Sequence, residues 1–165
     1  METPVGRLTL RASAHGLTHV LVVGSKKIPR AGPDPDPHPE ALGHLDAAVR
    51  ALDEYFEGQR KSFDELTLAP AGTSFQLRVW QELLRIPYGE TTSYGRLARQ
   101  IGRPSASRAV GLANGRNPIS VIIPCHRVIG ADGSLTGYGG GLPMKEWLLQ
   151  HEGALAQPEL DLRSA

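Results

Sequence analysis

Cysteine is almost absent from this chain of 165 residues, which contains a single one, Cys125. One cysteine excludes an intramolecular disulfide, and it excludes a zinc site built from several thiolates of the same chain. A lone cysteine in an intracellular protein is either inert core material or a working nucleophile. The role of Cys125 is therefore the main question that the sequence poses.

Long apolar runs are missing as well. The longest stretches, such as residues 121–123, are far too short to span a bilayer. Residues 1–6 lack the basic start and the apolar stretch of a signal peptide. We therefore expect a soluble, intracellular protein with no membrane partner.

Acidic side chains are absent from residues 91–131, although the whole chain is nearly neutral, with a formal net charge of +1. The same segment contains six arginines, namely Arg96, Arg99, Arg103, Arg108, Arg116 and Arg127. No local charge cancels the positive field of this segment. It is either a solvated basic face or a surface for phosphates, and charge alone favours neither.

The first part of the chain has the pattern of a small α/β lobe. Apolar and polar positions alternate over residues 5–23 with a break near Gly16, which predicts a β-hairpin. Apolar residues recur at helical spacing over residues 41–56. Residues 63–68 are a candidate further strand. Proline at every second position over residues 33–39 predicts a stiff, exposed connector.

A Pro-Ala-Gly break at residues 70–72 predicts the boundary between a lobe of residues 1–70 and a lobe of residues 71–165, whose last residues, 154–165, form a short mobile tail. The second lobe has the pattern of short helices over residues 74–84, 94–101, 106–113 and 144–150.

The second and third of these helices, joined by a tight turn, have the form of a helix-turn-helix. Small residues dominate the start of the third helix, where Arg108 is the only long side chain; they are Ser105, Ala106, Ser107, Ala109 and Gly111. Small side chains let a helix backbone approach a partner closely. That partner is either DNA or a neighbouring helix, and the spacing leaves both open.

Cys125 stands in the sequence Pro124-Cys125-His126-Arg127. A thiol is weakly reactive until its thiolate is stabilised, and an imidazole that serves as its base needs a third group to orient it. Glu152 is a candidate for that third group if the fold brings it near. The Cys-His pair alone is a weak motif, so a buried cysteine next to a surface histidine remains an alternative.

Residues 123–129, Ile-Pro-Cys-His-Arg-Val-Ile, are similar to the active-site signature of the O6-alkylguanine-DNA alkyltransferase family. Further motifs resemble that family in order and spacing, at residues 75–80, 86–90, 93–94, 107–111, 117–118, 138–142 and 145–149. The resemblance covers residues 73–153 and is specific as a set. The first lobe is only loosely similar to the family's variable N-terminal domain.

The resemblance implies an α+β fold, with a small ribonuclease H-like lobe of β-sheet and helix and a helical C-terminal lobe with a helix-turn-helix. It implies direct-reversal DNA repair by a methylated-DNA–[protein]-cysteine S-methyltransferase, a single-turnover suicide enzyme. An alkyl group moves irreversibly from O6 of guanine to the cysteine, after the protein binds the minor groove and flips the base. The expected partner is double-stranded DNA that contains O6-alkylguanine.

The resemblance further implies a monomer that needs no cofactor and no metal. Such a protein is expected in the cytoplasm, associated with the nucleoid, if its source is bacterial, and in the nucleus if its source is eukaryotic.

The resemblance also assigns catalytic roles. Cys125 is the alkyl acceptor, His126 is its base through a water molecule, and Glu152 orients His126. Asn117 supports the turn that carries the cysteine. Tyr94 donates a proton toward the leaving guanine and contacts the phosphate of the target nucleotide.

DNA binding is assigned to the helix-turn-helix. Arg108 enters the base stack, and the residues in contact with the DNA around it are Tyr94, Ser105, Ala106 and Gly111. Three further residues are assigned to the substrate pocket: Val128, Tyr138 and Gly139. The backbone groups of Val128 and Cys125 read the guanine edge, and Tyr138 forms a wall of the pocket. Gly139 replaces a serine of many relatives, and Ser120 replaces a second proline of some. Both differences concern the range of substrates, not the reaction.

Three other functions compete with this hypothesis. An alkyltransferase-like binding protein flips alkylguanine without chemistry, but such proteins lack the cysteine. A cysteine hydrolase built on Cys125, His126 and Glu152 needs an oxyanion hole, and it leaves the basic segment unexplained. A helix-turn-helix regulator leaves the cysteine without a function, and residues 105–111 offer almost no side chains that read the major groove.

Overall fold

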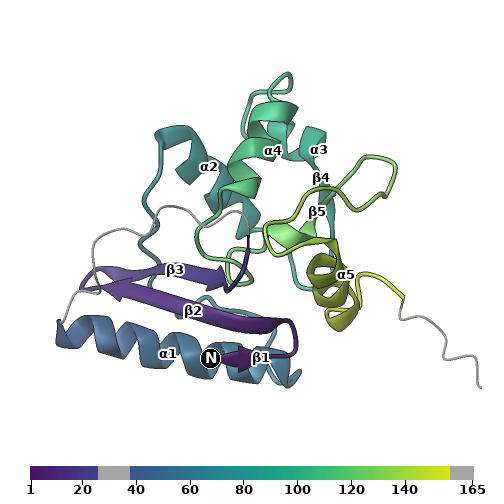
Figure 1. Ribbon diagram of the computed structural model, residues 1–165. Helices are drawn as coiled ribbons and strands as arrows, with labels where there is room; N and C mark the ends of the chain where they lie inside the picture. Colours follow the sequence, from purple (N-terminus) through teal and green to yellow (C-terminus); the bar gives the residue numbers. More distant parts are fainter. Residues whose placement is uncertain (26–37, 157–165) are drawn as a thin grey trace, which may run out of the picture.

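The computed structural model of the chain describes residues 1–25 and 38–156 and has an α+β fold, as expected (Figure 1). The first lobe consists of β1 (Glu2–Thr3), β2 (Gly6–Ser13), β3 (Gly16–Val22) and α1 (Pro39–Phe56). The second consists of α2 (Ser74–Leu83), β4 (Thr92–Ser93), α3 (Tyr94–Gln100), α4 (Ser107–Gly115), the 3₁₀ helix η1 (Cys125–Arg127), β5 (Val128–Ile129) and α5 (Leu142–His151). The predicted proline connector and C-terminal tail fall mostly outside the described residues.

The predicted hairpin is present and forms most of an antiparallel sheet in the order β1-β2-β3. The turn between β2 and β3 needs glycine at position 16, where φ is +142° and a Cβ would lie 2.6 Å from the backbone oxygen of Thr67. Alternation along the hairpin buries Leu8, Ala12 and Val20. The sheet lies between α1 and the second lobe (Figure 1).

The expected strand over residues 63–68 is wrong. Only Leu68 forms a bridge, and it pairs with Leu17 of β3 in parallel. The preceding residues turn instead, since the Leu66 N–H donates to the Phe63 carbonyl at 3.0 Å. The apolar residues of this segment pack against the core without a ladder, so an apolar run alone misidentified it.

The second lobe follows the predicted helices closely. Thr73 and Gln76 form a capping box at the start of α2, in which each side chain accepts from the other residue's backbone N–H. Ser93 caps α3, and Gly102, with φ at +73°, follows its end. Helices α2, α3 and α4 pack together, and α3 and α4 form the expected helix-turn-helix.

Helix α4 was predicted over residues 106–113 but begins at Ser107, after Ala106 as its N-cap, and continues to Gly115. Asn114 stays in the helix because its side chain is buried, and its Nδ2 donates to the Cys125 carbonyl at 3.4 Å. The helix therefore extends beyond its predicted end at residue 113, and Asn114 contacts the cysteine loop.

The two lobes share backbone hydrogen bonds next to that loop. The Val20 N–H of β3 donates to the Pro118 carbonyl at 2.9 Å, and the Ser120 N–H donates back to the Val20 carbonyl at 3.1 Å. The sheet of the first lobe thus fixes the segment that leads to Cys125. Within residues 1–25 and 38–156, no helix has the length and apolar character needed to cross a membrane.

Candidate active site

A buried, strained turn delivers the cysteine. The four apolar residues of the preceding segment, Ile119, Val121, Ile122 and Ile123, are almost fully buried. Val121 has φ at +71°, a conformation that a β-branched residue adopts only when its surroundings impose it, at a cost of roughly 1–3 kcal/mol. Asn117 supplies this constraint, since its Oδ1 accepts from the Ile119 N–H at 3.0 Å and its Nδ2 donates to the Ile123 carbonyl at 2.8 Å. Asn117 therefore bridges the two ends of the turn that leads to Cys125.

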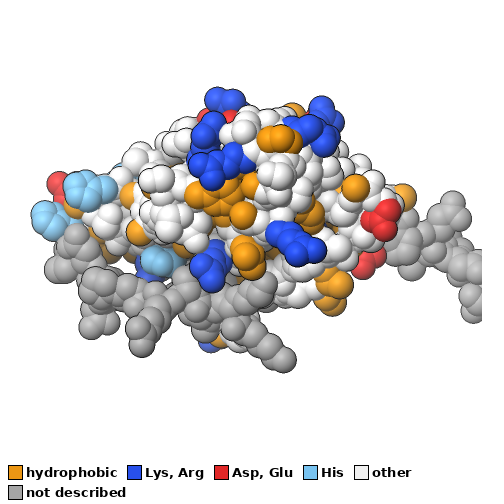
Figure 2. Space-filling model, turned by 90° about the horizontal axis from the view of Figure 1, so that it is seen from above, with side chains coloured by type: hydrophobic (Ala, Val, Ile, Leu, Met, Phe, Trp, Pro, Cys, Tyr) orange, Lys and Arg blue, Asp and Glu red, His pale blue; other side chains and the backbone are white. Residues whose placement is uncertain are grey.

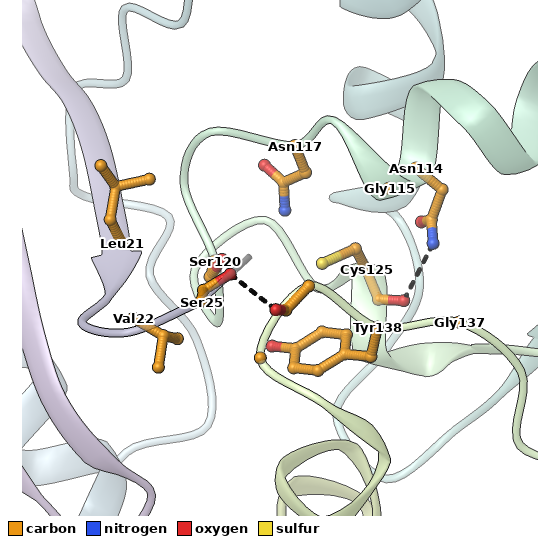
Figure 3. A pocket seen from close by; sticks show the side chains of 12 residues that line it. Leu21, Val22, Ser25, Asn114, Gly115, Asn117, Ser120, Cys125, Gly137 and Tyr138 are labelled. Atoms are coloured by element: carbon orange, nitrogen blue, oxygen red, sulfur yellow. Dashed lines mark hydrogen bonds between the residues drawn. The ribbon is translucent and has the colours of Figure 1, made fainter. Parts of the chain in front are cut away.

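Cys125 is 4% exposed and borders a pocket (Figure 3). Its side chain lies between those of Asn117 and Tyr138 in this view. The wall contains Asn114, Gly115, Asn117, Ser120 and the glycine-rich segment of Gly137, Tyr138, Gly139 and Gly140, and β3 adds Leu21, Val22 and the following Ser25. The Ser25 hydroxyl donates to the Gly139 carbonyl at 2.7 Å, so the first lobe also holds the pocket loop.

His126 is fully buried beside the cysteine in η1. Its Nε2 lies 2.8 Å from Oε1 of Glu152, the C-cap residue of α5. With Nε2–H donating to the carboxylate, Nδ1 is left as the basic nitrogen, and it has no hydrogen-bond partner among the described residues. Burial lowers the pKa of His126 and outweighs the opposing effect of Glu152, so the imidazole is neutral and able to accept a proton.

Glu152 is the centre of a buried hydrogen-bond network. Arg127 donates to both of its oxygens, through Nε at 2.8 Å and Nη2 at 2.9 Å, and the Tyr55 hydroxyl of α1 donates to Oε1 at 2.7 Å. Burial alone would raise the pKa of Glu152, but the hydrogen bonds from His126 and Arg127 outweigh it and hold the pKa far below its usual range. The carboxylate is therefore charged and fixed in orientation.

Lys145 is a buried cation near the sulfur. Its Nζ donates to the Val128 carbonyl at 2.5 Å and to the Thr136 carbonyl at 2.8 Å, and burial lowers the pKa of Lys145 to about 8. Burial raises the pKa of the Cys125 thiol, whereas the side chain of Asn117 and the charge of Lys145 act in the opposite direction. The thiol is thus shielded from water while groups that favour its thiolate surround it.

The remaining expected site residues divide between pocket and periphery. Tyr138 and Gly139 line the pocket, whereas Tyr94 and Val128 do not. Tyr94 begins α3, and its hydroxyl accepts from Thr136 Oγ1 at 3.1 Å. Its ring also faces Gly111, where a Cβ would lie 3.7 Å from Tyr94 Cδ1, an ordinary van der Waals distance. The Tyr94 ring and α4 are therefore neighbours, without glycine being required at position 111 for that contact.

The basic segment is mostly a surface. Arg96, Arg99, Arg103, Arg108 and Arg116 are exposed, as is Ser105, and Ala106 is half-buried. Figure 2 looks down on the α3–α4 end of the molecule and shows Lys and Arg side chains around an apolar area, with few acidic ones. The sixth arginine, Arg127, is buried against Glu152 and does not belong to this surface.

Sequence reasoning missed Lys145, Asn114 and Tyr55 as members of the site. One signal in the sequence could have identified Lys145, because it stands at an inward-facing position of its helix. It is next to Met144 and one turn before Leu148 and Leu149, and these three apolar residues are buried. Asn114 lies one residue beyond the predicted end of its helix, so the helical pattern did not include it. Tyr55 lies 97 residues from its partner, and no local pattern predicts such a contact.

Comparison with known proteins agrees with this geometry. Residues 1–70 match the ribonuclease-like domain of 6-O-methylguanine DNA methyltransferase, and residues 74–154 match the DNA-binding domain of the same family. The chain is 53% identical over 154 residues to a methylated-DNA–protein-cysteine methyltransferase of Methanosarcina acetivorans, covering 93% of this chain and 96% of that one. It is 51% identical over 164 residues to the Mycobacterium tuberculosis protein of the same name, covering 98% and 95%.

Solved structures give the same result for the fold. The crystal structure of Mycobacterium tuberculosis OGT in complex with DNA superposes with a TM-score of 0.80 at 49% identity, covering 93% of this chain and 91% of that chain. The likeness therefore extends over both lobes, including the sheet and α1.

Proposed function

The chain belongs to the 6-O-methylguanine DNA methyltransferase family, and we propose that Cys125 is the residue that accepts the alkyl group. The activity is direct reversal of DNA damage, in which an alkyl group passes from O6 of guanine in DNA to a cysteine of the protein. One observation carries the assignment: the sequence contains a single cysteine, and this cysteine borders a pocket and adjoins the His126–Glu152 pair.

The transfer is a single displacement at the alkyl carbon. The Sγ–C bond forms while the C–O6 bond breaks, and the thiol proton moves toward Nδ1 of His126. The leaving guanine takes up a proton from the Tyr94 hydroxyl, which regains one from solvent. The expected route to Nδ1 runs through a water molecule. Water does not cleave the resulting thioether, so each protein molecule reacts once.

Electrostatics supports these roles. His126 is kept neutral by burial, and Glu152 fixes its tautomer and turns Nδ1 into the acceptor. Lys145 and Asn117 oppose the effect of burial on the Cys125 thiol, so they stabilise the thiolate as it forms. A thiolate in a site of low dielectric is a strong soft nucleophile, which suits a soft alkyl carbon.

DNA is the partner, and we assign its binding to the exposed arginines of α3 and α4. Such a surface attracts phosphates without regard to sequence, as a repair protein requires. Arg108 would occupy the gap left by the flipped nucleotide, with Ser105, Ala106 and Gly111 along the minor groove and Tyr94 at the target phosphate.

In the pocket, Tyr138 and Gly139 would contact the flipped base, and the backbone of Val128 would read its edge. The Val128 carbonyl already accepts from Lys145, which leaves one lone pair for a nucleobase. We further propose lobes of residues 1–70 and 71–165, which the two matched domains at residues 1–70 and 74–154 support. Such a repair protein would act in the bacterial cytoplasm at the nucleoid or, in a eukaryote, in the nucleus.

The substitution Cys125→Ala tests the acceptor directly. We expect the variant to lose transfer from O6-methylguanine in duplex DNA and to retain DNA binding, because the DNA-binding surface lies on α3 and α4. Transfer and binding are measured on the same labelled duplex. Transfer that survives in this variant would overturn the assignment of the nucleophile.

A further inference from the structure

Tyr55 connects the first lobe to the active-site carboxylate. It lies near the end of α1 and is fully buried, and its hydroxyl donates to Oε1 of Glu152 at 2.7 Å. The first lobe also adds Leu21, Val22 and Ser25 to the pocket wall, whereas the proposed reacting groups, Cys125, His126 and Glu152, all belong to the second lobe. This hydrogen bond is therefore the most direct contact between α1 and the reacting groups.

The oxygen that Tyr55 contacts is also the one that orients the base. Glu152 Oε1 accepts from Tyr55, from His126 Nε2 at 2.8 Å and from Arg127 Nη2 at 2.9 Å. Three donors share one oxygen, so each takes part of its negative charge. Removal of the tyrosine hydroxyl therefore leaves more negative charge on Oε1 and strengthens its electrostatic interaction with the His126 imidazole.

The Tyr55 ring is held firmly enough to serve this purpose. It makes edge or tilted contacts with Phe56, Phe63, Tyr88 and His151, with ring centroids 5.1–6.2 Å apart. The Tyr55 backbone carbonyl also lies 2.7 Å from Nε2 of His151, the residue that directly precedes Glu152 in the chain. These contacts fix the position of the hydroxyl relative to the end of α5.

We propose that Tyr55 is a positioning residue for alkyl transfer: its hydroxyl holds the Glu152 carboxylate in place and moderates the basicity of His126. The proposal rests on the function proposed above, and it gives the first lobe a part in the chemistry. Tyr55 does not touch the substrate. It acts through Glu152 and His126.

The proposal has a signature in the pH profile. The charged and titratable groups around the Glu152–His126 pair come from five parts of the chain. They are Cys125, His126 and Arg127 of η1, Tyr88 of the turn before β4, Tyr138 of the glycine-rich pocket loop, Lys145 and His151 of α5, and Tyr55 of α1. Of these, His126 must be neutral to accept the thiol proton. Tyr55→Phe raises the pKa of His126, because a less shared carboxylate oxygen favours the imidazolium. The acid limb of the rate profile then moves to higher pH.

The experiment compares full-length wild type and Tyr55→Phe in single-turnover transfer between about pH 5 and 9, on duplex DNA with O6-methylguanine and on free O6-benzylguanine. We expect the rate at neutral pH to fall by about tenfold, the scale of one hydrogen bond to a charged group, equally on both substrates. Equal loss is expected because Tyr55 lies away from the DNA-binding helices.

Tyr88→Phe is the matched control. It removes a hydroxyl that donates to the His151 backbone carbonyl at 3.2 Å, next to the same carboxylate but not bonded to it. This variant should keep the wild-type pH profile. A purely structural role for Tyr55 would lower the thermal midpoint of Tyr55→Phe and leave its pH profile superimposable on that of the wild type.

A superimposable profile would overturn the proposal, and so would a loss confined to duplex DNA. Absence of transfer in the wild type would instead contradict the proposed function itself, so the two failures are distinct. If Tyr55→Phe does not fold, NMR of the wild type decides. The Tyr55 hydroxyl proton should give a slowly exchanging resonance in through-space contact with the Nε2 proton of His126, and its absence would contradict the proposal.

Discussion

Two opposed electrostatic effects act on the sulfur of Cys125. Burial disfavours the thiolate, and the buried Lys145 and the Asn117 side chain favour it. The thiol therefore stays protonated and protected until a substrate occupies the pocket, while the charge that forms during transfer already has its stabilising groups in place. This balance suits a protein that can react only once.

Lys145→Met tests the contribution of the cation. Loss of the charge should raise the pKa of Cys125 and lower the transfer rate at pH 7 by roughly tenfold to a hundredfold, since a nearby charge shifts a pKa by about 1–2 units. The rate profile should move to higher pH. Because the pKa of Lys145 is about 8, the difference from wild type should be largest below pH 8 and shrink above it.

Lys61→Met is the control for this substitution. Lys61 is an exposed lysine whose Nζ lies 5.7 Å from the centre of the Tyr88 ring, and its loss should leave the profile unchanged. A Lys145→Met variant that folds and keeps the wild-type profile would show that the cation does not act on the sulfur.

At this scale, the sequence predicted residues that stand in motifs and missed those that depend on the folded chain. Cys125, His126 and Asn117 lie in short segments whose local geometry the sequence largely determines. The pairing of Glu152 with His126 was expected only through the family resemblance. The contacts of Lys145 and Tyr55 join distant segments, and such contacts leave no periodicity in the sequence.

Helices α3 and α4 present the arginine surface, and glycines lie where the two helices face each other. A Cβ at Gly111 would lie 3.7 Å from Tyr94 Cδ1, and one at Gly95 would lie 3.7 Å from the hydroxyl of Ser107. Both distances are ordinary van der Waals contacts, so the packing of the two helices does not require glycine at either position. Helix packing alone therefore does not decide between the two partners that the sequence left open.

Arg108→Ala tests the proposed DNA-binding helix, α4. We expect slower repair of O6-methylguanine in duplex DNA, by about tenfold or more, because an unfilled gap makes it harder to keep the base unstacked. Reaction with free O6-benzylguanine should stay near the wild-type rate, since no base pair is opened.

Arg85→Ala is the matched control for charge loss, because Arg85 is exposed and pairs only at the surface with Glu82. Both substrates should react with this variant as with wild type. Equal losses of Arg108→Ala on duplex and free base would rule out a role in base extrusion.

Element prediction succeeded where a local signal was strong. The predicted hairpin turns at Gly16, and the predicted helices over residues 74–84 and 94–101 are delimited by local features, the Thr73 cap of α2 and the positive φ of Gly102 after α3. It failed at residues 63–68, where apolar side chains serve tertiary packing, and at the end of α4, where a buried contact with the cysteine loop holds Asn114 in the helix.

Over the whole molecule, both lobes contribute to one site. β3 holds the segment before Cys125, Ser25 holds the pocket loop, and α1 reaches Glu152 through Tyr55. Separation of the lobes would break all three contacts. We therefore expect the folded state to depend on the buried ionic network at their junction.

The free energy of unfolding of the protein should decrease as the pH falls, because of two groups in this network. His126 and Glu152 both have a lower pKa in the folded protein than their ordinary values of 6.5 and 4.5. The unfolded chain therefore binds more protons than the folded one once the pH drops below about 6.5, and stability declines from there as first His126 and then Glu152 contribute.

Thermal midpoints measured from pH 8 down to pH 4 should decrease steadily below about pH 6.5. In His126→Gln, the upper part of this decrease should be absent, because that residue no longer titrates. A midpoint that stays constant between pH 6.5 and pH 5 in the wild type would contradict the assignment of a buried neutral histidine.

The central claim is that one buried cysteine takes one alkyl group from DNA. Mass spectrometry of the protein after incubation with excess duplex O6-methylguanine tests it most directly. The account predicts one added methyl group per molecule, located on the peptide that contains Cys125, and product that never exceeds protein. A methyl group on another residue, or more repaired guanine than protein, would contradict it.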